Sequence, residues 1–201
     1  MKTNNKKTSK RFNSSNADKF LDYGVDVDNR IVNIVGDIEA ENISIYTNGI
    51  LLMLSKNKSD DIHIYINSFG GDPYTSFGFY NFLRSITTCN INTYNIGCAM
   101  SGASIIFLAG DHRYMYEDTV FMVHSVSSKA NGKVYLDLEE ETEECKQIHK
   151  QLCKIYARHT KLSAKQWDNM IKYKNRYYRA ADALDIGFVH KLLVDNDDKE
   201  V

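Results

Sequence analysis

Short β-type runs alternate with helix-type segments through most of this 201-residue chain. The runs at residues 30–35, 62–67 and 91–96 are each followed by a segment with helical apolar spacing or a helix-start signal. Asp72 and Pro73, for example, are typical of a helix N-cap and first helical position. This alternation predicts an α/β fold with a largely parallel sheet.

The second half of the chain predicts further elements. Ser163 and Gln166 have the spacing of a capping box that opens a helix. The remaining elements are strands at 112–116 and 120–124 around a Glu-Asp turn, a long helix over 134–160, a helix over 180–186 that Gly187 ends, and a strand over 188–193.

Composition and charge narrow the class of protein. The net charge of −1 gives no reason to expect a nucleic-acid or membrane partner, and no apolar run is long enough to predict a transmembrane helix. Four cysteines are too few for a disulfide scaffold, which favours a reducing, cytoplasmic compartment. Residues 1–19 predict a disordered basic arm and 195–201 an acidic tail, leaving 20–194 as the folded domain.

Two turns at predicted strand ends have residues suited to chemistry. Residues 67–72 contain adjacent glycines that can aim backbone N–H groups at an oxyanion, although a tight strand-to-helix turn also explains them. Residues 97–104 place Ser101 between a strand and a helix, as in a nucleophile elbow, or simply as an N-cap. His124 ends an apolar strand and could accept the proton of Ser101, but spacing alone cannot bring the two together.

Two other patterns favour simpler interpretations. Cys145, His149 and Cys153 recur every fourth residue of the long helix and could suggest zinc. They span about 12 Å by helix rise, too far for one ion, so helix packing is favoured and no metal is expected. The basic and aromatic run at 172–179 lacks a wider basic face, so nucleic-acid binding is not expected.

Four segments, in the family's order, resemble the ClpP peptidase family of the ClpP/crotonase superfamily. Residues 64–71 are similar to its Y-I-N-S-P-G-G turn, with Phe69 in place of proline, and 97–102 resemble G-x-A-A-S-M. Residues 121–124 resemble R-x-M-I-H, and 180–189 resemble S-A-x-E-A-x-x-Y-G-L-V. The resemblance implies a ClpP/crotonase-like spiral of β-β-α units with a protruding long handle helix.

The same resemblance implies site roles. Ser101 would be the nucleophile, His124 the general base, and the N–H groups of Gly71 and Gly102 the oxyanion hole. The family's third catalytic residue is usually an aspartate, whose position here holds Asn175. An amide can orient the imidazole without stabilising its charge, which predicts a slower or gated enzyme, and Asp168 is the alternative third member.

The resemblance further implies an assembly. We expect a serine endopeptidase that cuts unfolded polypeptides or short peptides within a homo-oligomer of stacked seven-membered rings, joined through the handle helix. No cofactor is expected, and ATP would enter only through an AAA+ unfoldase, whose axial-loop signature is missing here. His63 and Tyr65 fall on the family's docking strand.

Three alternatives stay open. One is a catalytically weak ring subunit or scaffold, which Asn175 favours. Another is a phage head-maturation protease acting without an ATPase, because the Asn-, Lys- and Ile-rich, proline-poor composition is typical of AT-rich bacterial or phage genes; its compartment would be the host cytoplasm. The third is a crotonase-like acyl-CoA enzyme, against which the combination of Ser101 and His124 argues.

Overall fold

A computed structural model describes residues 20–126 and 135–194, with side chains from 139 onward in the second range. The strands are β1 (Val25–Asp26), β2 (Ile31–Ile38), β3 (Ile62–Gly71), β4 (Ile91–Met100), β5 (His112–Tyr116), β6 (Val120–Val123), β7 (Arg176–Tyr178) and β8 (Lys191–Leu193). The helices are α2 (Ala40–Lys56), α3 (Pro73–Ser85), α4 (Gly102–Leu108), α5 (Tyr135–His159), α6 (Ala164–Ile171) and α7 (Ala180–Ile186).

The strands form one sheet in the order β1-β2-β3-β4-β5-β8. The pairs from β2 to β5, and β5 with β8, are parallel, as the alternation of strands and helices predicted. Local signals set several helix ends: the Asp72 carboxylate accepts a hydrogen bond from the N–H of Thr75 at the start of α3. The capping box of Ser163 and Gln166 opens α6 as predicted.

The two strands predicted around the Glu-Asp turn do not pair with each other. Instead they follow one another along β4: β5 pairs with Asn92–Asn95 and β6 with Cys98–Met100. The three-residue β7, which sequence patterns did not predict, pairs antiparallel with β6. This arrangement brings the end of β6 beside the end of β4.

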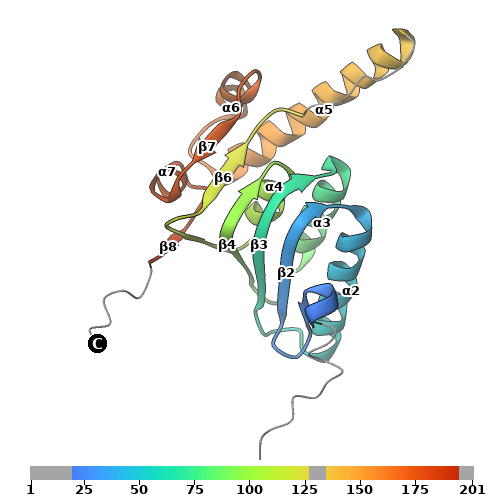
Figure 1. The fold of residues 1–201 in the computed structure, drawn as a ribbon, viewed down its shortest axis with the longest axis vertical. Coiled ribbons are helices and arrows are strands. Elements are labelled where there is room, and N and C mark those ends of the chain that lie inside the picture. The colour runs from blue at the N-terminus through green and yellow to red at the C-terminus, as the bar shows by residue number, and fades with distance from the viewer. Residues whose placement is uncertain (1–19, 127–134, 195–201) are drawn as a thin grey trace, which may run out of the picture.

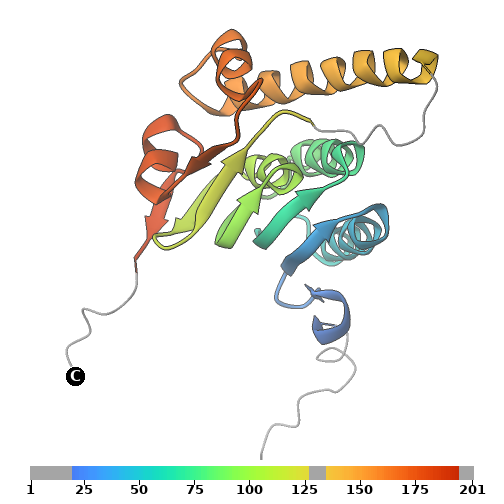
Figure 2. The ribbon, with the colours of Figure 1, turned by 45° about the horizontal axis from the view of Figure 1, so that its top comes forward.

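Helices α2, α3 and α4 pack on one face of the sheet, and α5 crosses above them (Figures 1 and 2). Alternate residues of β3 point into this layer, where Ile62, Ile64 and Ile66 are fully buried. The hydrophobic core therefore lies between the sheet and these helices.

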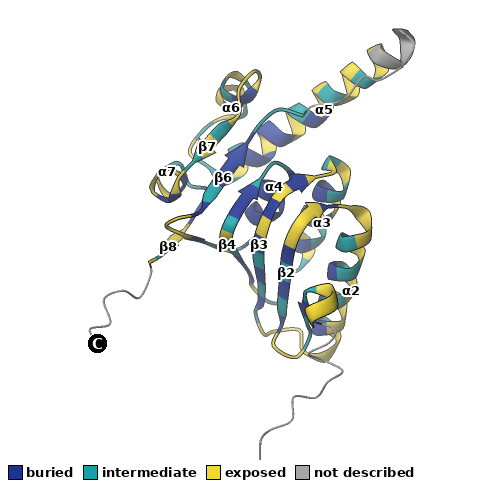
Figure 3. Ribbon diagram, viewed as in Figure 1, coloured by how far each residue is buried: buried dark blue, intermediate teal, exposed yellow. Residues whose placement is uncertain are grey.

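The long helix α5 has two different halves. The first half projects beyond the body of the molecule (Figure 2), and residues 139–147 are exposed or half-buried. In the second half Ile148, Leu152, Ile155 and Tyr156 are buried (Figure 3). Tyr156 packs against Trp167 of α6, with ring centroids 5.4 Å apart, which fixes α6 to the body.

Two sequence expectations lie outside the described residues: the basic arm at 1–19 and the acidic tail at 195–201. Among the described helices, none is long and apolar enough to span a bilayer.

Candidate active site

The ends of β4 and β6 bring Ser101 and His124 together. These paired strands are parallel, with Met100 opposite Met122, so the residues that follow them emerge at the same edge of the sheet. His124 Nε2 lies 2.6 Å from Ser101 Oγ, which is hydrogen-bond distance. The fold thus supplies the proximity that sequence spacing could not establish.

The backbone of Ser101 is strained. Its φ of 51° and ψ of −123° are rarely adopted by residues other than glycine. Its N–H donates a 2.9 Å hydrogen bond to the carbonyl oxygen of Met122, which ties the turn to β6. Although Ser101 is the N-cap residue of α4, its side chain caps no backbone N–H there. Its Oγ faces His124 instead, and strained residues of this kind cluster at functional sites.

The two glycine-bearing turns contact each other. Gly70 has a φ of 106°, and a Cβ there would lie 2.7 Å from both the Met100 carbonyl oxygen and Ser101 Cβ, so only glycine fits. A Cβ on Gly102 would lie 3.3 Å from the Gly71 nitrogen. The two predicted oxyanion donors are therefore neighbours beside Ser101. As the first residue of α4, Gly102 has an N–H without an intrahelical acceptor.

Burial lowers the pKa of His124 below its ordinary 6.5. The imidazole is half-buried at the edge of the sheet. A lowered pKa keeps the ring neutral at neutral pH, and only the neutral ring can accept the serine proton. The electrostatics of the site therefore suit a general base.

A small cavity of about 100 Å³ opens beside these groups. Its polar wall contains Gly71, Ser101, Gly102 and His124. The other wall is apolar or aromatic and consists of Pro73, Ile105, Val126, Leu152 and Tyr156. Such a cavity can hold an apolar side chain next to the serine oxygen. Leu152 lies in the apolar stripe of the long helix, and this helical spacing alone gives no sign of its place in the cavity.

Comparison with known proteins decides the family. The family model described as Clp protease matches residues 15–196, which is most of the chain. The chain belongs to the Clp protease family. Family membership makes it a serine-type endopeptidase, as the sequence motifs predicted.

Individual relatives agree with this assignment. The chain is 29% identical over 172 residues to the ATP-dependent Clp protease proteolytic subunit 1 of Rhodopirellula baltica, covering 84% of this chain and 74% of that protein. An Asn-to-Asp mutant of ClpP1 from Listeria monocytogenes has a TM-score of 0.76 and 23% identity, covering 85% of this chain and 95% of the other. The structural likeness confirms the predicted ClpP-like fold.

Within this Clp protease fold, Asn175 directly precedes β7, the strand that pairs with β6. Val123 of β6 pairs with Arg176 of β7, so the next position along the pairing sets Asn175 opposite His124. The Asn175 side chain is exposed, and no hydrogen bond within the described residues joins it to His124. Its predicted role as third member stays a prediction.

Asp168, the alternative third member, is engaged elsewhere. Its Oδ1 lies 2.8 Å from Nε2 of His149 on α5, which is hydrogen-bond distance. This carboxylate would have to leave that partner before it could orient the base.

Proposed function

We propose that the chain is a ClpP-type serine endopeptidase in which Ser101 is the nucleophile and His124 the general base. The 2.6 Å contact between Ser101 Oγ and His124 Nε2 is the observation on which this proposal rests. Its substrates would be unfolded polypeptides or short peptides that present an apolar side chain to the adjacent cavity.

The proposed chemistry has two halves. His124 Nε2 takes the hydroxyl proton while Ser101 Oγ attacks the peptide carbonyl carbon. The oxyanion formed accepts hydrogen bonds from the N–H groups of Gly71 and Gly102. His124 then gives its proton to the leaving amine, and a water molecule activated by His124 hydrolyses the acyl-enzyme ester. These protein groups suffice, so we propose no cofactor for the chemistry.

Covalent labelling tests the assignment of the nucleophile. A fluorophosphonate reacts only with an activated serine, forming an oxygen–phosphorus bond and releasing fluoride. Intact mass should show one label per chain in the parent and in a Ser85→Ala control at the end of α3, and none in Ser101→Ala. A labelled Ser101→Ala variant, or an unlabelled parent in its assembled state, would contradict the proposal.

A weak ring subunit is the second candidate function, and Asn175 favours it. A neutral and unbonded residue opposite His124 provides neither charge nor orientation. Slow labelling of the parent, accelerated by mixing with an active paralogue, would support this candidate. Rapid labelling of the pure protein would exclude it.

Ring assembly is part of the proposal. The projecting half of α5 reaches beyond the body and could contact a facing ring (Figure 2). We propose stacked seven-membered rings, as the family resemblance implies. Native mass spectrometry would give fourteen chains for this assembly, whereas a fully active monomer would overturn it.

An AAA+ unfoldase is the proposed partner. The Rhodopirellula baltica relative is named as the proteolytic subunit of an ATP-dependent protease.

On this chain Tyr65, Tyr94 and Tyr114 stack across β3, β4 and β5, with ring centroids 4.6 and 4.9 Å apart. These half-buried rings offer an apolar surface for an unfoldase loop. Tyr65→Ala should abolish unfoldase-dependent degradation of a folded substrate while leaving hydrolysis of a short peptide unchanged. Equal loss of both activities would contradict docking at this surface.

A further inference from the structure

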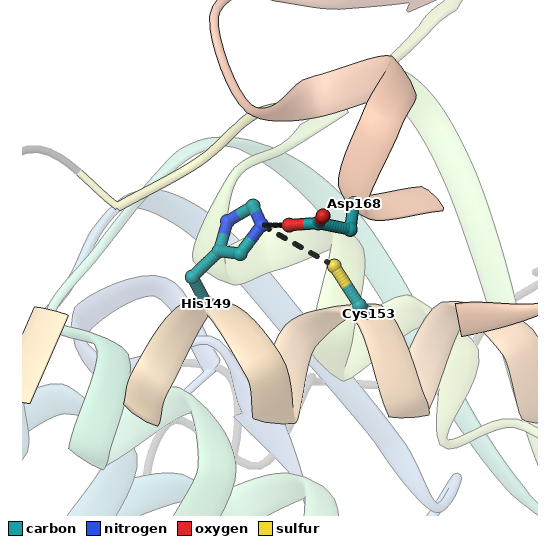
Figure 4. Close-up of side chains that lie close together, drawn as sticks. All are labelled: His149, Cys153 and Asp168. Atoms are coloured by element: carbon teal, nitrogen blue, oxygen red, sulfur yellow. Dashed lines mark hydrogen bonds and ion pairs between the residues drawn. The ribbon is translucent and has the colours of Figure 1, made fainter. Parts of the chain in front are cut away.

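Three side chains suited to metal binding meet between α5 and α6, apart from the peptidase groups (Figure 4). His149 and Cys153 lie one turn apart on α5, and Asp168 comes from α6. Their ligand atoms all lie within 4.8 Å of one another. Cys145 shares the helical spacing of His149 and Cys153 but is not in this group, and the carboxylate of Asp168 takes its place.

The distances between these atoms are close to those around a tetrahedral zinc ion. Zinc bonds of about 2.0–2.3 Å place neighbouring ligand atoms roughly 3.3–3.8 Å apart. Cys153 Sγ lies 3.6 Å from His149 Nε2, within that range. His149 Nε2 and Asp168 Oδ1 are 2.8 Å apart and must separate by about half an ångström to admit the ion. The Asp168 side chain is 44% exposed, so it has room to turn.

The imidazole of His149 is already oriented for this role. Its Nδ1 lies 3.0 Å from Ser125 Oγ, so the other ring nitrogen, Nε2, faces Cys153 and Asp168. A hydrogen bond to the second ring nitrogen is the usual support for a histidine that binds metal. The histidine side chain is only 12% exposed, which limits its alternative rotamers.

The donor types select zinc over the common hard cations. Imidazole nitrogen and thiolate sulfur suit zinc, whereas Mg²⁺ and Ca²⁺ prefer oxygen ligands.

A cavity of about 420 Å³ gives an ion access to the cluster. His149 and Asp168 both line it, so the fourth coordination position can open toward solvent. Exposed lysines also line this cavity, and their charge favours an anionic fourth ligand such as hydroxide or chloride; they are Lys146, Lys150 and Lys172.

We propose that His149, Cys153 and Asp168 form a zinc site that links α5 to α6, with water or an anion as fourth ligand. Because His149 and Asp168 line a different cavity from Ser101, the ion takes no part in the proposed attack on the peptide. It is nevertheless connected to the peptidase site: Ser125 directly follows His124, and Val126 lines both cavities. The α6 helix also leads to Asn175, so a bound ion would steady the segment opposite His124.

Zinc binding by the full-length chain tests this site. After removal of metal with a chelator, calorimetric titration with ZnCl₂ alone should give one ion per chain in the parent. The Asp168→Asn and Cys153→Ala variants should bind on the order of tenfold more weakly or worse. The control is Cys145→Ser, which removes a different cysteine of α5, two turns before Cys153. This variant should bind zinc like the parent. Asp168→Asn keeps the shape of a half-exposed side chain, so it tests the site even if Cys153→Ala fails to fold.

The absorption spectrum of bound Co²⁺ tests whether the Cys153 thiolate is a metal ligand. Co²⁺ added alone should give a thiolate-to-metal charge-transfer band in the parent and in Cys145→Ser, and none in Cys153→Ala. Absence of zinc binding by the parent would overturn the proposal. Unchanged affinity in Asp168→Asn, or loss of the cobalt band in Cys145→Ser, would also overturn it. None of these readings depends on peptidase activity, so this site and the proposed function can fail separately.

Discussion

The hydroxyl of Tyr156 lies 3.2 Å from Ser104 Oγ, which itself donates a 2.6 Å hydrogen bond to the carbonyl oxygen of Ser101. This connection ties the long helix α5 to the strained turn that presents the serine. Tyr156 is fully buried, and burial raises its pKa, so its hydroxyl stays protonated. The position of Ser101 thus depends on a residue 55 places later in the chain.

Tyr156→Phe should loosen this turn without emptying the core. We expect about 1 kcal/mol less stability from the lost hydrogen bond. The fluorophosphonate labelling rate should fall by up to about tenfold, because small displacements of a reacting group cost rate. Tyr173→Phe, at an 85% exposed position, is the matched control and should leave both unchanged. An unaltered labelling rate alongside the stability loss would show that the hydroxyl supports only packing.

The labelling rate should depend on pH through His124. The base works only when neutral, and burial lowers its pKa below 6.5. The rate should therefore stay constant from neutral pH down to the lowered pKa and fall as the pH drops through it. Rates measured at constant ionic strength from neutral to mildly acidic pH will give the midpoint. A midpoint above 6.5 would contradict this view of the site.

The cavity beside Ser101 should favour substrates with an apolar side chain before the cleaved bond. Leu152→Phe narrows its apolar wall. We expect kcat/KM for a leucyl peptide to fall about tenfold relative to an alanyl peptide, since filling a pocket discriminates by such factors. Leu52→Phe, on the exposed side of α2, should not change the ratio. A parallel loss for both peptides would indicate general damage rather than selectivity.

Elements with strong local signals were predictable, and long-range relations were not. The span of α2 follows from its apolar spacing, and α6 begins at its capping box because such signals act within one turn. By contrast, β7 has three residues and exists because it pairs with β6, more than 50 residues earlier. The meeting of Asp168 with His149 likewise depends on how α6 packs against α5, which no local pattern encodes.

In the candidate site, too, the residues with local sequence signals could be predicted and their contacts in space could not. Ser101, His124 and the two glycines could be named from three short motifs, but the contact between Ser101 and His124 depends on the pairing of β4 with β6. The contribution of α5 to the cavity could not be predicted, because the helical spacing of Leu152 is that of an ordinary core residue.

Substitution of Asn175 should change the rates of labelling and peptide hydrolysis directly, because the β6–β7 pairing sets this residue opposite His124. Asn175→Asp would place a carboxylate at the backbone position that continues the β6–β7 pairing opposite His124. A carboxylate there stabilises the imidazolium formed during attack and raises the pKa of His124. We expect labelling and peptide hydrolysis to accelerate on the order of tenfold or more, with the pH midpoint moving upward. Asn169→Asp on α6 adds the same charge away from the base and should have neither effect. If Asn175→Asp folds like the parent but turns over no faster, residue 175 does not act on His124.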